Sequence, residues 1–265
     1  MKNYRGAVFF DFDGTLVDEG EKIFIPTKST KDSIQKLQEN HFMVGLATGR
    51  ARCYVPETGI DFDCYITSNG ACATVNGEYI INDKLTTNEL TELISYFDEN
   101  NYGYITENHD ACYYSKNNYE SFMEMMNHFN ISMNCFFPMP EDINIVQANK
   151  MMFTYNGDKL FSKLIENFGD KYNITKHRSN PSGDLVKQNI SKASGINQIM
   201  KHFKLDLNDT YAFGDGDNDY DMLKTVGYGI AMGKHTKQLE NIASFVTETV
   251  LNEGITVGLK NYGLI

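Results

Sequence analysis

Short, continuous apolar runs alternate along this chain with segments whose apolar residues recur at helical spacing. Runs of this kind are typical of strands that a parallel sheet buries on both faces. Between two of them, residues 30–40 place Ile34 and Leu37 on one side and predict a helix. The order strand, helix, strand favours an α/β sheet with right-handed crossovers. The first three predicted strands are "AVFF" at 7–10, "FMVGLA" at 42–47 and "CYITS" at 64–68.

The pattern then changes. Asn76-Gly77 between "ACATV" and "EYIIN" predicts a β-hairpin. From about Asp83 to Val186 the chain is rich in Asn, Tyr and Met, which indicates a separate α/β layer. Its predicted elements are helices at 86–99, 117–129 and 158–168, a hairpin around "ENHDACYYS", and the strands "KMMFTY" and "NITKHR".

The strand–helix alternation resumes near residue 190. Here the predicted elements are helices at 191–203, 220–225, 237–243 and 253–262, and the strands "TYAFG" and "YGIAM". We therefore expect an α/β protein with a Rossmann-like parallel-sheet core domain, made of residues 1–82 and 187–265. A smaller α/β domain, residues 83–186, is expected to be inserted into it.

The composition of the chain limits the kinds of partner that it could bind. The 265 residues carry a formal net charge of −11, and nucleic acids or anionic membranes call for a basic surface. No window approaches the roughly 18 apolar residues of a membrane span, and we see no export signal. We expect a cytoplasmic protein. Its five cysteines form no C-x-x-C pair and are expected to be reduced thiols with packing roles.

Two carboxylates, Asp11 and Asp13, directly follow the first buried strand. Active sites of open α/β sheets collect at the carboxyl ends of strands, and residues two apart share a face while the backbone is extended. Gly14 and Thr15 add a turn whose N–H groups could cradle an anion. By itself, this stretch is equally consistent with an ordinary acidic turn.

Other polar clusters also follow predicted strands. In "LATGR", Thr48 offers a hydroxyl and Gly49 a closely approachable backbone, while the role of Arg50 stays open. In "GDGDNDYDML", acids crowd the end of the strand "TYAFG". An EF-hand loop would need Gly sixth and Glu twelfth, counted from Asp215, but Tyr220 and Val226 stand there. A Mg²⁺ site that shares its ion with a phosphate fits better.

Lysine is the remaining candidate. Lys192 opens the predicted helix at 191–203, and on spacing alone Lys187 competes with it. There is no G-x-x-x-x-G-K-[ST] loop and no G-x-G-x-x-G after a strand. These absences argue against a common nucleoside triphosphatase or dinucleotide enzyme.

Taken together, the motifs resemble those of the haloacid dehalogenase-like phosphatases. "DFDGTL", "ATGR", a lysine that opens a late helix, and "GDGDND" occur in that order, and "ITSNGA" and "NEGI" agree. An insert after the Thr motif resembles the α/β cap of the Cof-type branch. This chain departs from the pattern at Ala193, where Gly is common, and in the short segment from Thr48 to Asn69.

The resemblance implies roles for particular residues. Asp11 would be the nucleophile that forms an aspartyl-phosphate, and Asp13 the general acid and base. Mg²⁺ would lie between the Asp11 carboxylate, the Asp13 backbone carbonyl and Asp215, with Asp219 either as a further ligand or as an acid that supports the ligands. Thr48 and Lys192 would hold the phosphoryl oxygens. The other residues placed at the phosphate site are Gly14, Gly49, Asn69 and Asn218; Asp217 is assigned no role.

The expected function is therefore Mg²⁺-dependent hydrolysis of a small phosphorylated metabolite, such as a sugar, flavin or pyridoxal phosphate. Two alternatives stay open. A phosphomutase or phosphotransferase would pass the phosphoryl group from Asp11 to another alcohol, and a non-catalytic sensor would bind the metabolite without turnover. The sequence indicates neither the physiological substrate nor the oligomeric state.

Overall fold

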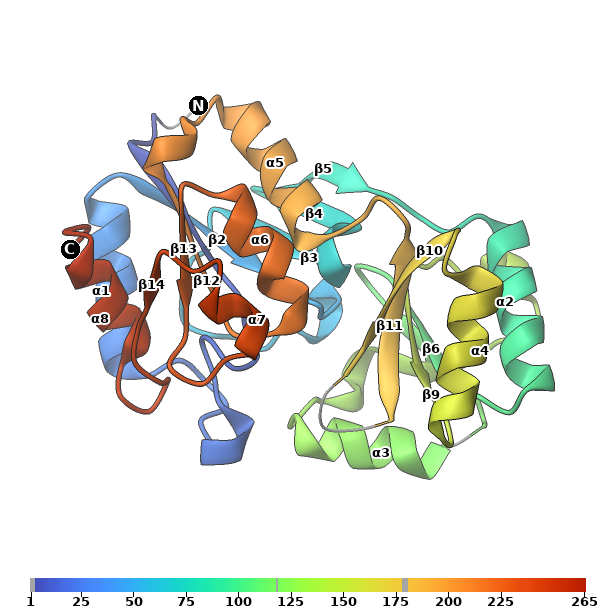
Figure 1. Cartoon of the computed structure of the whole chain (residues 1–265). Coiled ribbons are helices and arrows are strands. Elements are labelled where there is room, and N and C mark those ends of the chain that lie inside the picture. Colours follow the sequence, from blue (N-terminus) through green and yellow to red (C-terminus); the bar gives the residue numbers. More distant parts are fainter. Residues whose placement is uncertain (1–2, 118, 178–180) are drawn as a thin grey trace. The chain divides into compact units, whose positions relative to one another are not determined.

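The structure is a computed structural model that describes residues 3–117, 119–177 and 181–265, without the side chains of residues 121 and 128. Residue 118 of the predicted helix at 117–129 and Arg178 of the predicted strand "NITKHR" lie outside the described residues. The chain forms two compact units (Figure 1). Unit 1 comprises residues 1–49, 56–81 and 191–265, and unit 2 comprises residues 50–55 and 82–190.

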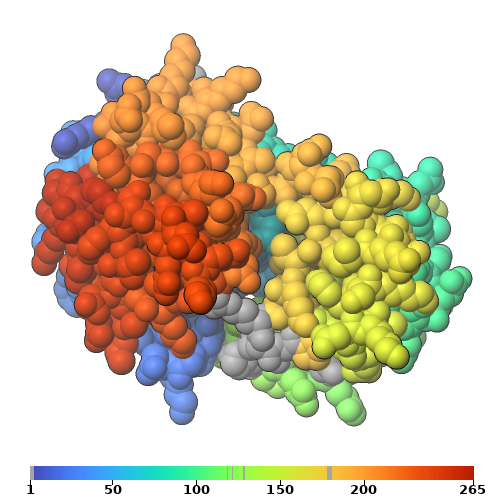
Figure 2. Space-filling view, viewed as in Figure 1, coloured from blue at the N-terminus to red at the C-terminus, as the bar shows by residue number. Residues whose placement is uncertain are grey.

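Both ends of the chain build unit 1, which is drawn mainly in blue and in orange to red in Figure 2. Its eight-stranded sheet has the order β14-β13-β12-β1-β2-β3-β4-β5. The strands from β14 to β3 run parallel, and β4 is antiparallel to β3. The bounds are β1 (Gly6–Phe10), β2 (Phe42–Ala47), β3 (Cys64–Thr67), β4 (Cys72–Val75), β5 (Glu78–Asn82), β12 (Thr210–Gly214), β13 (Tyr228–Ala231) and β14 (Phe245–Val246).

Helices cover both faces of this sheet (Figure 1). The residues of β1 alternate between the faces, so that Ala7 and Phe9 pack with α5 and α6 while Phe10 stacks on Phe213 on the other face. This two-sided burial explains why the strands read as continuous apolar runs. The helices are α1 (Lys28–Glu39), α5 (Lys192–Phe203), α6 (Tyr220–Thr225), α7 (Lys237–Glu240) and α8 (Gly254–Asn261).

The hairpin predicted at Asn76-Gly77 joins β4 and β5, which are neighbours in the sheet. Asn76 has φ 50° and Gly77 has φ 81°, and positive φ at both central residues is the requirement of the tightest β-hairpin turns. Local chemistry therefore fixes this turn.

Unit 2 has its own six-stranded sheet, in the order β10-β11-β9-β6-β7-β8, which is antiparallel apart from the pair β7–β8. The strands are β6 (Gly103–Glu107), β7 (Cys112–Tyr114), β8 (Phe136–Pro138), β9 (Lys150–Thr154), β10 (Tyr172–Lys176) and β11 (Ser182–Lys187). The helices are α2 (Thr87–Glu99), α3 (Tyr119–His128) and α4 (Asp158–Phe168). This mixed architecture confirms the α/β class and its smaller second sheet.

The two faces of the unit 2 sheet differ. Phe153 on β9 packs with the apolar residues of α2 and α4, including Phe97 and Leu164. Its neighbour Met152 faces the other way and packs with Phe122 and other residues of α3. The side-chain period of two along β9 therefore supplies both apolar clusters of this unit.

Three stretches that were expected in the core domain belong to unit 2 instead, namely residues 50–55, residue 82 and residues 187–190. Ala51 is fully buried in the apolar cluster around α3. The Tyr54 hydroxyl donates to Glu107 Oε2 at 2.6 Å, and Lys187 is the last residue of β11. The segment that follows "TGR" holds only a three-residue 3₁₀ turn, Arg52–Tyr54.

Within the residues that the structure describes, no helix is both long enough and apolar enough to span a membrane.

Candidate active site

The predicted site residues of unit 1 lie at the carboxyl ends of three adjacent parallel strands. Asp11 follows β1, Thr48 follows β2 and Asp215 follows β12. The strand register is kept past β1, because the Asp11 N–H donates to the Phe213 carbonyl at 3.0 Å. Strand order alone thus gathers side chains that are up to 204 positions apart in the sequence.

Lys192 joins this group from the first turn of α5. Its side chain is 1% exposed, and its Nζ donates to Asp11 Oδ1 at 2.5 Å and to Asp219 Oδ1 at 2.7 Å. Asp219 is also fully buried, and its Oδ2 accepts the N–H groups of Asp215 and Gly216, each at 2.9 Å. A lysine so deeply buried needs partners of this kind. Spacing alone left Lys187 open as well, and the family resemblance pointed to Lys192.

Charges and burial shift the pKa values of this pair. Burial raises the pKa of the Asp11 carboxyl to about 7, and the Asp219 carboxylate adds to this against the attraction of Lys192. Burial alone would lower the pKa of Lys192, but Asp11 and then Asp219 raise it above its ordinary value. Like charges crowded in a buried site are costly without a compensating cation.

Asp11, Asp215 and Asp219 each offer a carboxylate oxygen within 4.8 Å of the other two. With the Lys192 ammonium, these three carboxylates leave a formal charge of −2. The donor set is all oxygen, and Asp215 is half-buried whereas Asp11 and Asp219 are buried. Mg²⁺ prefers one or a few carboxylates together with waters and substrate phosphate. The residues present therefore fit Mg²⁺, which Asp11, Asp215 and Asp219 could hold.

The backbone at residue 14 lies so close to the carboxylate group of Asp215 that only glycine fits there. A Cβ at Gly14 would lie 2.4 Å from the carboxyl atoms of Asp215, and its φ is +88°. Thr15 Oγ1 donates to Asp215 Oδ1 at 3.3 Å. The "DFDGT" turn is thus packed directly against the third carboxylate, and glycine is needed there for both space and conformation.

The same turn corrects one expectation. The Gly14 N–H donates to the Val17 carbonyl at 2.9 Å and the Thr15 N–H to the Phe12 carbonyl at 3.3 Å. These two amides close the turn instead of pointing at an anion. Half-buried Asp13 raises the pKa of Asp11, so its carboxylate is close, but it lies outside the three-carboxylate group.

A left-handed turn brings Asn69 to the end of β2. Thr48 is fully buried and accepts the Asn69 N–H at its carbonyl at 3.1 Å. Ser68, Asn69 and Gly70 all have positive φ, from 51° to 98°. The exposed Asn218 donates through Nδ2 to Asn69 Oδ1 at 3.4 Å, which links the acidic loop to this turn. The turn and the loop therefore meet beside Thr48.

Four other candidates from the sequence are Asp217, Lys187, Arg50 and Gly49. Exposed Asp217 accepts from Gln238 at 2.8 Å, on the side of α7. Lys187, in unit 2, donates to Asp83 Oδ1 at 2.7 Å. Arg50 is buried in unit 2, and half-buried Gly49 is the residue of unit 1 that precedes it.

Sequence reasoning missed a buried charged cluster in unit 2. Lys150 donates to Asp184 Oδ1 at 2.8 Å and lies 3.2 Å from Glu107 Oε2, and all three are buried. Burial alone would raise the pKa of Asp184, but Lys150 and then His177 hold it below its ordinary value. Charged residues inside the strands "KMMFT" and "SGDLVK" were the available signal.

Comparison with known proteins shows which family this chain resembles. A family model for haloacid dehalogenase-like hydrolases matches residues 8–259. A Bacillus subtilis (strain 168) protein named "Putative phosphatase YkrA" is 29% identical over 272 residues, or 97% of this chain and 98% of its own. "Putative phosphatase BU028/BU029" of Buchnera aphidicola is 30% identical over 241 residues, which cover 86% of this chain and 85% of its own.

A solved structure agrees on the fold. The sugar phosphatase BT4131, of subclass IIB of the superfamily, matches with a TM-score of 0.86 at 24% identity over 98% of this chain and 100% of its own. The model match over most of the chain, the relatives' names and the shared fold all point the same way. The chain therefore belongs to the haloacid dehalogenase-like hydrolases, in the Cof-type branch, and is an enzyme of the phosphatase class.

Proposed function

We propose that this protein hydrolyses phosphate monoesters of small metabolites through an aspartyl-phosphate on Asp11. The observation that carries the proposal is the position of the Asp11 carboxylate. It is buried at the end of β1, it is held by Lys192, and it lies within 4.8 Å of Asp215 and Asp219. A nucleophile fixed in this way meets the main demand of phosphoryl transfer, which is positioning and neutralisation of charge.

In the first proposed step, an Asp11 carboxylate oxygen bonds to phosphorus as the bond to the ester oxygen breaks. Asp13 gives its proton to the leaving alcohol. In the second step, Asp13 takes a proton from water, whose oxygen attacks phosphorus and releases phosphate and the Asp11 carboxylate. Lys192 and Thr48 hold phosphoryl oxygens in both steps. A general acid of this kind contributes about 10²–10⁴-fold.

Mg²⁺ is proposed as the cofactor, held by Asp11, the Asp13 carbonyl, Asp215 and Asp219. It would supply positive charge opposite the phosphate. The formal charge of −2 on the three carboxylates and Lys192 supports a divalent ion. The overall charge of −11 supports it as well, because the protein as a whole repels an anionic substrate.

The test is phosphate release from a panel of sugar, flavin and pyridoxal phosphates, with Mg²⁺ or with EDTA. We expect turnover by the wild type with Mg²⁺ only, and none by Asp11→Asn. Asp221→Asn is the matched control, since Asp221 is an exposed acid of the same "GDGDNDYDML" stretch. Activity that survives Asp11→Asn would refute the assignment of the nucleophile.

The same assay separates the alternatives. Phosphate that appears on an added sugar acceptor, and not in solution, would establish a phosphotransferase. Mg²⁺-dependent binding of a panel member without turnover would establish a sensor. Either result would overturn hydrolysis as the function.

A further inference from the structure

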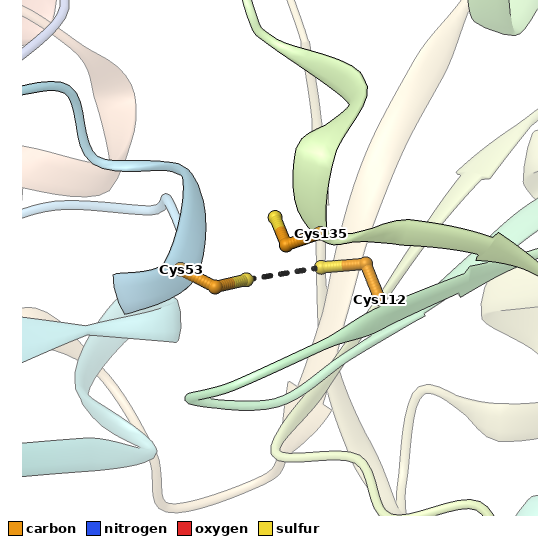
Figure 3. Close-up of side chains that lie close together, drawn as sticks. All are labelled: Cys53, Cys112 and Cys135. Atoms are coloured by element: carbon orange, nitrogen blue, oxygen red, sulfur yellow. Dashed lines mark hydrogen bonds between the residues drawn. The ribbon is translucent and has the colours of Figure 1, made fainter.

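Three cysteines from distant parts of the sequence meet in unit 2. Cys53 lies in the 3₁₀ turn Arg52–Tyr54, Cys112 begins β7, and Cys135 immediately precedes β8. All three residues belong to unit 2. Figure 3 shows the side chains of Cys53 and Cys112 pointing toward each other, with Cys135 beside them. Their Sγ atoms all lie within 4.8 Å of one another, and Cys53 and Cys112 are 3.7 Å apart.

The surrounding structure holds these thiols in place. Cys112 pairs with Phe136 in the β7–β8 register, so Cys135 is next to the residue opposite Cys112. The Tyr54 ring packs on Phe136 with centroids 5.2 Å apart, which fixes the turn that carries Cys53. The cluster therefore rests on two strands and a ring contact, and not on a loose loop.

We propose that Cys53, Cys112 and Cys135 form a binding site for one thiophilic d¹⁰ metal ion, Zn²⁺ or Cu⁺. Thiolates bind Zn²⁺ at about 2.3 Å. Three thiolates around one ion at that distance stand about 3.8–4.0 Å apart. The Sγ–Sγ separations of 3.7 Å and at most 4.8 Å therefore need only small side-chain adjustments.

The chemistry of the cluster selects a soft ion. Three sulfur ligands favour Zn²⁺ or Cu⁺ over Mg²⁺ or Ca²⁺, which prefer oxygen. The apolar neighbours include Met126, Phe122 and Phe136, and the Asn108 carbonyl accepts from Cys53 Sγ at 3.7 Å. Cys112 is fully buried, while Cys53 and Cys135 are half-buried, so an ion and one water could reach the site from their side.

Binding at this cluster would be coupled to proton release. Thiolates and not thiols are the ligands, so an ion that binds Cys53, Cys112 and Cys135 displaces their protons.

This site is independent of the proposed phosphatase centre, whose carboxylates lie in unit 1. An ion here would tie residues 50–55, which directly follow the Thr48-Gly49 turn, to the β7–β8 edge of the unit 2 sheet. Its contribution would be to the stability of unit 2, in the way that structural metal ions stabilise small domains.

The test uses the full chain, reduced with a phosphine and freed of metal, with excess Mg²⁺ present to occupy carboxylates. Co²⁺ is titrated as the probe, and thiolate-to-metal charge-transfer absorbance is recorded. We expect saturation at one equivalent and displacement by Zn²⁺ or Cu⁺, whose relative order shows which ion the site prefers. Cys112→Ser and Cys135→Ser should weaken binding at least about tenfold, since loss even of an indirect partner costs that much.

Cys64→Ser is the matched control, because Cys64 is as buried as Cys112 but lies in β3 of unit 1. A second measurement needs no variant: saturating Zn²⁺ should protect Cys53 and Cys135 from alkylation, read by mass spectrometry. No charge-transfer band, an unchanged band in Cys112→Ser, or unchanged alkylation would each overturn the proposal. So would thiols that form a Cys53–Cys112 disulfide under mild peroxide and bind no metal when reduced.

Discussion

At the residue scale, the Lys192 ammonium group is held by two short hydrogen bonds in a buried site. It donates to Asp11 and to Asp219, and all three side chains are buried. Removing one partner of a buried ion pair costs far more than the pair contributes, because the remaining charge keeps its desolvation penalty. The stability of the fold and the proposed chemistry therefore depend on the same three side chains.

Lys192→Met tests this dependence. It should lower the free energy of unfolding by about 3–5 kcal/mol in the absence of Mg²⁺, and abolish phosphate release. Lys187→Met is the control, since the half-buried Lys187–Asp83 pair is worth about 0–1 kcal/mol. Denaturant titration and phosphate assays measure both effects. Wild-type stability of Lys192→Met would contradict the view that Lys192 compensates Asp11 and Asp219.

Gly14 gives a second prediction at this scale. In Gly14→Ala the new Cβ would lie 2.4 Å from the Asp215 carboxyl atoms and must displace them. Displacements near 1 Å can cost about 10²-fold in rate, so kcat/KM should fall by about that factor. Gly77→Ala has a similar positive φ but meets no atom within 4 Å, and should keep its activity. Equal activities of the two variants would show that the close contact does not matter.

At the scale of elements, the first turn of α5 positions Lys192. Ser191 caps this helix in a reciprocal capping box with Ser194. Helix α2 in unit 2 begins with the same arrangement, between Thr86 and Glu89. The two caps are chemically matched, and only the cap of α5 adjoins a residue of the candidate active site.

The substitutions Ser191→Ala and Thr86→Ala each remove one of these two matched caps. Each should lower the free energy of unfolding by about 0.5–2 kcal/mol, since loss of a cap leaves helix N–H groups unpaired. Only Ser191→Ala should also reduce kcat, because it loosens the turn that holds the Lys192 side chain. Steady-state kinetics and thermal unfolding separate the two effects. If Thr86→Ala reduced kcat as much, a local positioning role for the α5 cap would be refuted.

The unit 2 sheet supports a prediction of pH dependence. The folded-state pKa of Asp184 is below its ordinary 3.8, so its stabilisation is complete at neutral pH and is lost as the pH falls below about 4. Burial raises the pKa of Glu107 despite the attraction of Lys150. Its unfavourable contribution is therefore relieved as the pH falls toward its ordinary 4.5.

Asp184→Asn should thus destabilise the protein at pH 7, and its difference from the wild type should shrink between pH 4 and pH 3. Glu107→Gln should show the opposite trend, with the wild type gaining stability relative to the variant from pH 7 toward pH 4.5. Urea titrations at stepped pH measure both differences. Parallel pH profiles for the two variants would contradict the opposed pKa shifts.

At the scale of the whole molecule, the chain passes between its units four times, after Gly49, Val55, Ile81 and Ile190. A chain of two compact units is not expected to unfold as a single two-state system. A ligand that binds one unit should accordingly shift the transition of that unit first.

Mg²⁺ provides this test. If the ion binds the carboxylates of unit 1, a concentration of 100 times its Kd should stabilise that unit by about 2.7 kcal/mol. Asp215→Asn should lose the shift, whereas Asp221→Asn should keep it. Differential scanning calorimetry with Mg²⁺ or EDTA gives the measurement. A shift that persists in Asp215→Asn would place the ion elsewhere.

Individual strands and residues show which parts of the fold could be predicted from the sequence and which could not. Strands buried on two faces, such as β1 and β2, need apolar residues at almost every position, so they appear in the sequence as continuous apolar runs. The predicted bounds of these strands agree with the structure within a residue or two. β11 was missed because Asp184 and Gly183 interrupt its pattern, and Asp184 is tolerated there because Lys150 on β9 and His177 lie beside it. β8 and β14, with three and two residues, are too short to show a period.

What the sequence determined by itself was local: buried strands, the Asn76-Gly77 turn, helix caps, and acids and glycines at strand ends. These follow from backbone sterics and side-chain chemistry within a few residues. Tertiary structure decided which remote groups meet. It paired Lys192 and not Lys187 with Asp11, assigned residues 50–55 to unit 2, and gathered Cys53, Cys112 and Cys135. Such contacts depend on strand order and packing, which a short stretch of sequence does not specify.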